Sequence, residues 1–520
     1  MQKYIALFLG GLLIFTLTIQ NVGAQSATLR QHPLRFRASY ETLQMHNEPN
    51  LGMLGLGADF FIVDQSPNFY LSLYSYSAVV GKRPGLITFG TGAGYIKPLF
   101  NSPLSFDVGL YLGGGGGGGA PDGGGLISRG HLNLSFQLGD VSVFGGYSRL
   151  DFPTGDMGSH NFNIGLSLSS LFRSAHFLGE SDPKPKDLDS PTNKSKFRIN
   201  ISAQNYLKFA GIPTFQNELP PPGEGEIYLL GVELDQFFYE NWYAALKLHG
   251  AVAGGIDGYM SYLVGLGYEQ PLGSDRLLLD AQLLTGPSGG GNVATGGGAI
   301  VQGALGLRAH LGDSYSIKAA LGQTLSPGGS FNGSFVELGL GKSFFFISSK
   351  NGGGGLYHMK PTDRAHGFGF EIQNRTYFSP DLLDKNGYPY DKAFNLLGFQ
   401  LSKRVHRNFD ILGATYWAYQ GSYGAYAEGL LGLGYRQGIS EDWMLRAQVL
   451  GGAAGGGGID LGSGMVVQYS AGMERSLNDK WGFTVGVGQM RGIRGNFTPI
   501  FADLGIGYRF TKIENRQNHN

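Results

Sequence analysis

The sequence predicts an all-β protein, a transmembrane antiparallel β-barrel of about 24 strands, from three observations. First, runs of strand length alternate polar and apolar residues with a period of two along the chain. Second, the connections between these runs alternate between long and tight. Third, 88 glycines, 27 tyrosines and 35 phenylalanines accompany only 15% charged residues, which is unlike a soluble enzyme. Together these features are typical of a barrel with one strand face in lipid.

The first 24 residues are expected to be a signal peptide. Lys3 precedes an apolar run from Tyr4 to Ile19, and the small residues near Ala24 suit a cleavage site. Beyond this segment, no apolar run approaches the roughly 18 residues that a membrane-spanning helix needs. The sequence therefore predicts an exported chain without a helical anchor.

The chain contains no cysteine. Disulfides, thiolate metal ligands, a thiol nucleophile and a lipoprotein anchor are therefore excluded. The 39 basic and 39 acidic residues balance, so the net charge gives no reason to expect nucleic acid as a partner.

Three glycine clusters mark an internal repeat. The segment after each cluster aligns without a gap: GLISRGHLNLSFQLGD ends at Asp140, GAIVQGALGLRAHLGD at Asp313 and GMVVQYSAGMERSLND at Asp479. The first two segments agree at 8 of 16 positions, and the aspartates are 173 and 166 residues apart. The units open with the alternating strands RFRASYETL, FRINISAQNYL and FGFEIQNRTYF. We therefore predict three copies of one unit, each with about eight strands.

The expected domain layout follows from these units. It comprises a signal peptide at 1–24, barrel repeat 1 at 33–171, a linker at 172–196, barrel repeat 2 at 197–346, a linker at 347–366, barrel repeat 3 at 367–510 and a polar tail at 511–520. In each unit the odd-numbered connections are longer than the even-numbered ones. Long connections are expected outside the cell and tight ones in the periplasm, as in outer-membrane barrels.

The strand DLGIGYRF near the end of the chain resembles the C-terminal assembly signal of bacterial outer-membrane proteins. Asp503, Gly505, Tyr508 and Phe510 occupy its polar, glycine and two aromatic positions. The resemblance implies a Gram-negative outer membrane, and it implies that the barrel-assembly machinery, outer-membrane lipid and lipopolysaccharide are partners, with other envelope proteins as further candidates. In that family the signal is usually the last strand, whereas here residues 511–520 follow it.

Each unit resembles the small eight-stranded outer-membrane barrels of the OmpA and OmpX type in size and in its Gly-x-Gly-aromatic strands. Two architectures remain open, namely three small barrels or one porin-like barrel of 24 strands. Inward positions carry small residues, and both signs of charge occur within each unit: Arg37, Glu41, Asp59 and Asp107 in the first, for example. Paired charges suit a narrow lumen filled by side chains, which favours three barrels. One wide barrel stays an alternative, because long joints permit strand pairing between units.

The expected function is that of a non-enzymatic structural or docking scaffold at the cell surface. The alternative is a channel or translocation pore formed by one 24-stranded barrel. A third hypothesis is a lipid-modifying enzyme. It depends on two pairs, His131 with Ser135 and Ser159 with His160, which occur in the first unit alone. No catalytic residue, cofactor or metal site is predicted, since the 11 histidines do not cluster at ligand spacing.

The glycine clusters fall in the fifth connection of each unit and are predicted to form hairpins on the outer side. Glycine permits sharp bends and the close approach of two backbones. The hairpins are therefore expected to pack against one another or against a partner protein. The residues predicted for this contact are Gly115, Gly116, Gly117, Gly118, Gly289, Gly290, Gly291, Gly455, Gly456 and Gly457.

Overall fold

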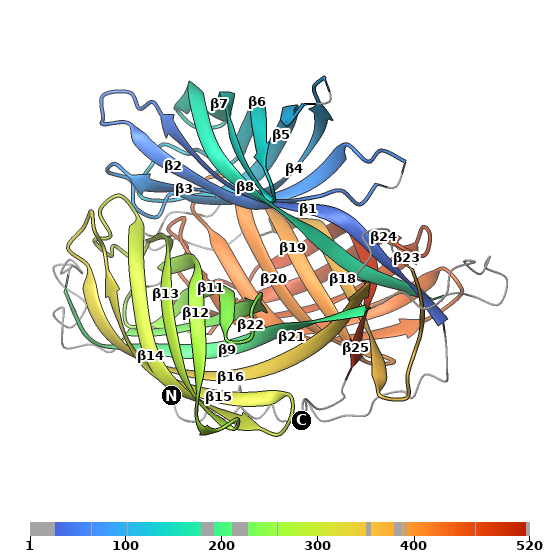
Figure 1. The fold of residues 1–520 in the computed structure, drawn as a ribbon. Coiled ribbons are helices and arrows are strands. Elements are labelled where there is room, and N and C mark those ends of the chain that lie inside the picture. Colours follow the sequence, from blue (N-terminus) through green and yellow to red (C-terminus); the bar gives the residue numbers. More distant parts are fainter. Residues whose placement is uncertain are drawn as a thin grey trace.

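The described part of the computed structural model has 25 β-strands and no helix long and apolar enough to cross a membrane (Figure 1). It describes residues 26–177, 192–210, 227–349, 355–378, 387, 389 and 393–515, apart from the single positions 64, 101, 257, 463 and 494. The predicted signal peptide lies outside the described residues. All recorded strand pairs are antiparallel, which confirms the predicted all-β antiparallel barrel.

The first eight strands close on themselves. β1 pairs with β2 on one side and with β8 on the other, so this group of strands has no free edge along its barrel segment. We call the group ring 1. Its strands are β1 (Ser26–Leu43), β2 (Leu51–Phe60), β3 (Phe69–Val80), β4 (Ile87–Pro98), β5 (Leu104–Gly116), β6 (Ile127–Leu138), β7 (Val141–Phe152) and β8 (Met157–Phe177).

The next strands form ring 2, in which β9 pairs with both β10 and β16. Its strands are β9 (Thr192–Ala210), β10 (Ile227–Phe237), β11 (Trp242–Ala253), β12 (Met260–Ser274), β13 (Leu277–Gly289), β14 (Ala299–Leu311), β15 (Tyr315–Leu325) and β16 (Asn332–Ser349). A short strand, β17 (Gly355–His358), follows and pairs with β1.

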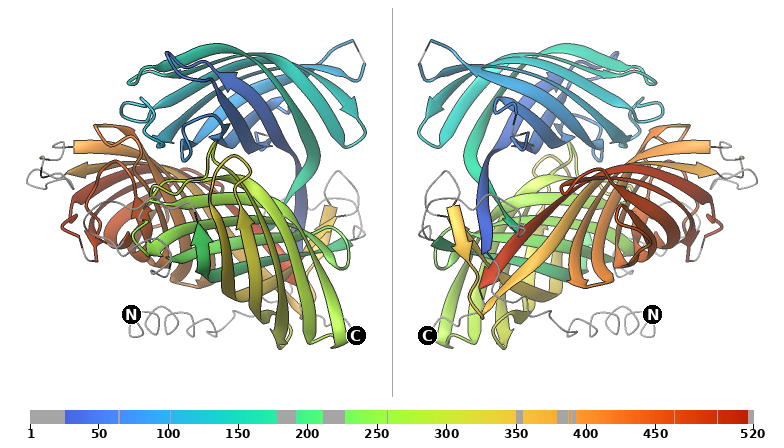
Figure 2. Two further views of the ribbon diagram at one scale, coloured as in Figure 1. Left: turned by 90° about the vertical axis from the view of Figure 1, so that its left-hand side faces the viewer. Right: turned by 90° about the vertical axis from the view of Figure 1, so that its right-hand side faces the viewer.

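The last eight strands form ring 3, in which β18 pairs with both β19 and β25. Its strands are β18 (Asp363–Phe378), β19 (Ala393–His406), β20 (Phe409–Gln420), β21 (Ala427–Gly438), β22 (Trp443–Gly455), β23 (Met465–Ser476), β24 (Trp481–Gly492) and β25 (Ile500–Asn515). Figures 1 and 2 show the three groups as separate curved walls, coloured blue to teal, green to yellow and orange to red.

These pairings differ from those of the alternative, a single ring of 24 strands. That ring would need β8 beside β9, whereas β8 returns to β1, β16 returns to β9 and β25 returns to β18. Antiparallel strands joined by tight turns pair locally, and closure after eight strands leaves no barrel edge to pair with the next group.

Several strands run beyond the predicted domain boundaries. β1 begins at Ser26, before residue 33, and β8 and β9 extend into the predicted linker 172–196. β16, β17 and β18 likewise occupy parts of 347–366, and β25 includes Thr511–Asn515 of the predicted polar tail. Most of these extensions continue the pairing of their own ring, as β1 with β8, β9 with β16 and β18 with β25. A few pairs also join the groups: Thr511 pairs with Ala175, Phe346 pairs with Glu514, and β17 pairs with β1. These polar segments lack the alternation of polar and apolar residues that marks a strand, so the sequence did not predict strands there.

These extensions meet in a small apolar cluster that draws on all three rings. Its buried members are Ala27, Leu29, Ala175, Ile347, Tyr357, Met359 and Ile513. We call the end of each ring where the first and last strands leave it the terminus end, and the opposite end, which carries the glycine clusters, the loop end. The apolar cluster ties the rings together at the terminus end.

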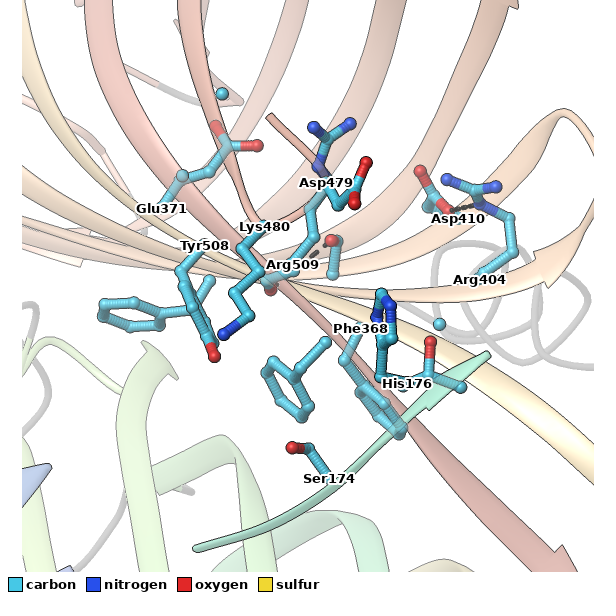
Figure 3. A pocket seen from close by; sticks show the side chains of 18 of the residues that line it. Ser174, His176, Phe368, Glu371, Arg404, Asp410, Asp479, Lys480, Tyr508 and Arg509 are labelled. Atoms are coloured by element: carbon cyan, nitrogen blue, oxygen red, sulfur yellow. Dashed lines mark hydrogen bonds and ion pairs between the residues drawn. The ribbon is translucent and has the colours of Figure 1, made fainter. Parts of the chain in front are cut away.

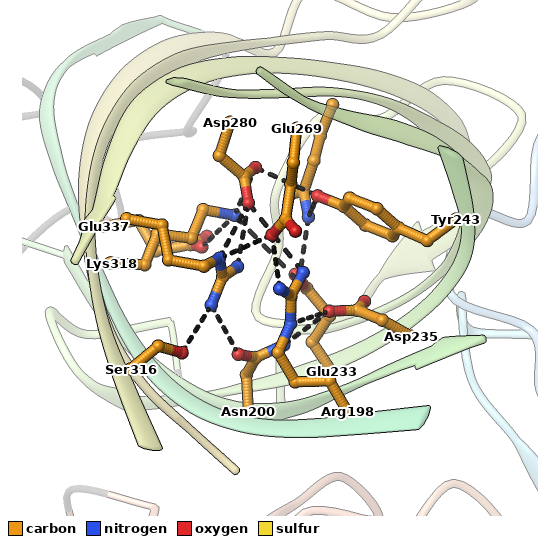
Figure 4. Close-up of polar contacts among 12 residues, drawn as sticks. Arg198, Asn200, Glu233, Asp235, Tyr243, Glu269, Asp280, Ser316, Lys318 and Glu337 are labelled. Carbon is orange, nitrogen blue, oxygen red and sulfur yellow. Dashed lines mark hydrogen bonds and ion pairs between the residues drawn. The ribbon is translucent and has the colours of Figure 1, made fainter. Parts of the chain in front are cut away.

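The lumen of ring 2 is filled by a network of ion pairs to which all eight strands contribute a charged side chain (Figure 4). Arg198 donates to Asp235 at 2.8 Å and also pairs with Glu269. Arg308 lies 2.9 Å from Asp280. The other members are Glu233, Lys247, Lys318 and Glu337, with Lys318 3.2 Å from Glu337. Every one of these residues is buried, and each charge has an opposite charge beside it.

The other two lumens follow the same principle. In ring 1, Arg35 lies 2.9 Å from Asp107, and Arg129 lies 2.7 Å from Glu41. In ring 3, Arg375 lies 2.8 Å from Glu428 and 2.9 Å from Asp503. Arg446 lies 2.7 Å from Glu371. Interior glycines make room for these long side chains: a Cβ on Gly341 would lie 2.5 Å from the Asn200 side chain. Each lumen is thus a packed polar core.

Replacing one buried arginine should destabilise its ring strongly. Arg198→Met removes the arginine that pairs with Asp235 and one of the cations beside Glu269, and a buried charge left without its partner costs about 3–5 kcal/mol. Urea unfolding in detergent micelles measures this loss. The exposed Arg149→Met, whose side chain is 60% accessible, serves as the control and should leave the unfolding free energy nearly unchanged, because solvent screens an exposed ion pair. Equal effects of the two variants would contradict a network that stabilises the ring.

Candidate functional site

The three rings line a shared apolar space, which we call the central chamber. Its volume is about 2550 Å³, and outward faces of all three rings line it. Ring 1 contributes Phe36, ring 2 contributes Leu248 and ring 3 contributes Leu401 among many others. Pockets for small molecules typically measure about 300–1,000 Å³, so the chamber is larger than a drug-sized site.

At the loop end, each ring rests its third loop on the glycine hairpin of another ring. The third loops are residues 81–86, 254–259 and 421–426, and the glycine hairpins are residues 113–126, 286–298 and 451–464.

The contacts form a cycle. A Cβ on Gly85 in ring 1 would lie 2.5 Å from the backbone nitrogen of Gly290 in ring 2. A Cβ on Gly258 in ring 2 would lie 3.0 Å from the backbone nitrogen of Gly456 in ring 3. A Cβ on Gly125 in ring 1 would lie 2.6 Å from a carbonyl oxygen in the third loop of ring 3. Ring 1 thus contacts ring 2, ring 2 contacts ring 3 and ring 3 contacts ring 1, which is how head-to-tail interfaces close.

The predicted hairpin glycines fall into two groups. Gly116 and Gly289 approach another ring, because a Cβ on either would come within 3.0 Å of backbone atoms in that ring's third loop. Gly455 belongs with them, since it faces Gly258 of ring 2. The other seven predicted glycines each pack on the third loop or on a strand of their own ring. They are Gly115, Gly117, Gly118, Gly290, Gly291, Gly456 and Gly457. These seven also have a positive φ. Apart from Gly455, whose surroundings enter only through Gly258, a Cβ at each of these positions would lie within 3.0 Å of another atom.

The third-loop side of this contact was not predicted from the sequence. Gly85 and Gly258 each precede an apolar residue that is fully or almost fully buried, Leu86 or Tyr259. Aligning the third connections would have shown this small-then-apolar pattern, RPGLI and IDGYM, beside the more obvious glycine clusters. A single glycine in a loop carries little signal by itself.

An apolar cluster beneath the hairpins draws on three rings. Ile87 and Phe89 come from ring 1, Met260 from ring 2, and Trp417 with Ala427 from ring 3. The Phe89 and Trp417 rings stack with centroids 6.1 Å apart. This cluster and the hairpins cover the loop end of the chamber.

One carboxyl group sits inside the hairpin contact between ring 1 and ring 3. The Asp122 side chain accepts the N–H of Gly117 at 2.8 Å and is 8% exposed. Its burial next to Gly424 raises the pKa of this carboxyl to about 6. The contact therefore excludes water well enough to disfavour a charge.

At the terminus end, aromatic side chains run from ring to ring. Ring-centroid distances are 5.9 Å for Phe60 to Phe172, 5.0 Å for Phe172 to Phe510, 5.4 Å for Phe510 to Phe368, 6.1 Å for Phe368 to Phe346 and 5.6 Å for Phe346 to Phe344. The row crosses ring 1, ring 3 and ring 2 in that order.

The predicted assembly-signal residues lie in the wall of ring 3. Phe510 belongs to the aromatic row, and the Tyr508 ring packs 5.1 Å from Trp481. Asp503 points inward to Arg375, while a Cβ on Gly505 would lie 2.5 Å from the Thr484 hydroxyl. Their recognition by the assembly machinery stays a prediction.

A second, smaller cavity of about 330 Å³ lies at the terminus end of ring 3 (Figure 3). Extensions of ring 1 line one side of it through Ser174 and His176, and ring 3 supplies the rest. Arg404 donates to Asp410 at 2.8 Å in its lining. The ring 1 extension thus lies against the terminus end of ring 3.

The histidines do not form the pairs that an acyl-transfer enzyme would use. His131 contacts Tyr70, Asp107 and Arg129 in the ring 1 lumen. His160 bonds the Tyr147 hydroxyl on the outer wall. In the described residues, no group of three or more potential ligands is placed to hold a metal ion.

No protein-family model and no curated protein matches the chain. Solved structures match weakly. A variant of the ferric enterobactin receptor PfeA of Pseudomonas aeruginosa is 9% identical, with 94% of this chain and 82% of that chain covered and a TM-score of 0.28. The siderophore receptor PirA of Acinetobacter baumannii is 9% identical (95% and 81% covered, TM-score 0.26), and OpdQ of Pseudomonas aeruginosa is 8% identical (94% and 99% covered, TM-score 0.23). Scores this low give no guide to function.

Adding one methyl group at the hairpin contact should loosen the rings. Gly289→Ala would force its Cβ into the backbone of Gly85, and overpacking of this kind costs about 1–3 kcal/mol. Hydrogen exchange should accelerate at residues 81–86 and 289–298 without loss of protection in the barrel strands. Gly303→Ala is the control, because a Cβ there meets nothing within 4 Å. Unchanged exchange in Gly289→Ala would show that the contact is not tight.

Proposed function

We propose that the chain is a non-enzymatic integral protein of a Gram-negative outer membrane, built from three copies of an eight-stranded barrel unit similar to the OmpA and OmpX type. The three copies act together as a structural or docking scaffold at the cell surface. The filled lumens carry this proposal, because buried ion pairs from all eight strands of ring 2 occupy the space that a channel would need to keep open.

The outward faces support a membrane setting. Large apolar side chains such as Leu134, Leu166 and Leu283 are 54%, 54% and 64% exposed, so in water these walls would present extended apolar patches. Trp242, Trp443 and other exposed aromatic residues lie where strands begin at the terminus end, which suits an interfacial girdle. Both termini would then face the periplasm, and the glycine hairpins would face the outside.

The scaffold function follows from what the fold presents at its two ends. At the loop end three contacts between a third loop and a glycine hairpin join the rings in a cycle, and at the terminus end extensions of three rings join in one apolar cluster. A rigid unit with two composite ends offers positions for envelope partners on either side of the membrane. Recognition by the barrel-assembly machinery through Phe510 and its neighbours belongs to the same proposal.

Planar-bilayer recording tests the proposal directly. The purified full chain should insert without discrete conductance steps, because each lumen is packed with paired charges. A general porin in the same bilayers provides the positive control, and membrane fractionation checks that the chain reaches the outer membrane. Stable openings of uniform size would contradict the scaffold and favour a channel. Recovery in the soluble fraction would contradict the membrane assignment itself.

A further inference from the structure

The central chamber raises a question that a scaffold alone does not answer, namely what fills it. Its walls are the outward faces of three barrels, with Phe36, Ile199, Leu248, Phe370 and Leu401 among the lining residues. Loss of contacts around an unfilled apolar volume is destabilising, and water gains nothing from such walls. In a membrane, lipid acyl chains are apolar like these walls and would fill the chamber.

The charged groups that face the chamber from the three rings are all positive. Lys82, Lys342 and Lys403 line it. Two further lining residues, Arg37 and Glu428, turn their charged groups into the lumens, where Arg37 meets Asp107 at 3.1 Å and Glu428 meets Arg375 at 2.8 Å. Among the described lining residues, the charges on the chamber side of the walls are therefore cationic.

Two of these lysines converge at the terminus end from different rings. The Lys403 ammonium of ring 3 lies 3.8 Å from the centre of the Phe344 ring, which belongs to ring 2. The Lys342 ammonium lies 5.6 Å from the same ring centre and donates to the Tyr315 hydroxyl at 2.7 Å. Two ammonium groups around one aromatic side chain, at the edge of an apolar volume, match a lipid whose head group carries a phosphate.

We propose that the central chamber is a binding site for an anionic glycerophospholipid, with acyl chains between the three rings and the phosphate beside Lys342 and Lys403. The inference rests on the proposed membrane function. A lipid of the periplasmic leaflet fits better than lipopolysaccharide, because the lysine pair is at the terminus end and the glycine hairpins close the loop end. The single Lys82 at the loop end offers only one ammonium group.

Trp417 provides a built-in probe of chamber occupancy. It lines the chamber, is 8% exposed and packs under the hairpins with Ile87 and Phe89. The chain has three other tryptophans, Trp242, Trp443 and Trp481, so changing these to phenylalanine leaves one reporter. Bromine atoms on acyl chains quench tryptophan on contact, so bulk lipid outside the three rings should reach Trp417 poorly.

The experiment reconstitutes this single-tryptophan chain in phosphatidylcholine vesicles with a small fraction of phosphatidylglycerol brominated on its acyl chains. We expect Trp417 to be quenched at least tenfold more efficiently than with the same fraction of brominated phosphatidylcholine. Lys342→Gln with Lys403→Gln should abolish that preference. Lys97→Gln is the matched control, since Lys97 is an exposed lysine at the terminus end of ring 1 that does not line the chamber.

Native mass spectrometry of the detergent-solubilised wild-type chain gives a second measurement that does not need the variants to fold. It should show retained phosphatidylglycerol. Equal quenching by both lipids, retained lipopolysaccharide in place of phospholipid, or the same loss in the Lys97→Gln control would overturn the site. A chain that inserts in bilayers without conductance but retains no lipid would overturn this inference alone, whereas a chain that does not insert would overturn the proposed function.

Discussion

Closure of the backbone hydrogen-bond ladder after every eighth strand is the constraint on which the rest of the structure depends. A strand in an apolar medium must satisfy its N–H and C=O groups within the protein, and a ring does this without an edge. β1 pairs with β8, β9 with β16 and β18 with β25, so each group meets the requirement by itself. A ring of eight also has a narrow interior, which side chains must fill.

The space inside a ring and the space between rings are filled in opposite ways. Inside ring 2, long charged side chains such as Arg198 and Arg308 reach across the lumen and are compensated in pairs. Between rings, side chains are removed: Gly85 and Gly289 bring two backbones into direct contact. Because the third-loop contact repeats from ring to ring, the three barrels form a closed assembly within one chain, and the central chamber is the space left along its middle.

Local patterning predicted what is local in this fold. The alternation in strands such as β18 and β25, the antiparallel barrel and the position of the glycine hairpins follow from sequence periods and turn residues. What the sequence could not supply depends on long-range geometry. β17 and the extended ends of β1, β8 and β25 pair through polar segments that resemble linkers. The partners of the hairpins were equally hidden, since Gly85 and Gly258 are single glycines whose importance appears only when another ring approaches.

Ring closure is tested most directly by disulfide trapping, because the chain has no cysteine of its own. Double cysteine variants would be made at facing outward positions: Ala38 with Leu166, Ile201 with Leu340, and Ile372 with Ile506. The account predicts that all three pairs form disulfides under mild oxidation, while Leu166→Cys with Ile201→Cys stays reduced. Disulfides between β8 and β9 in place of the three ring-closing pairs would contradict closure after eight strands and favour one wide barrel.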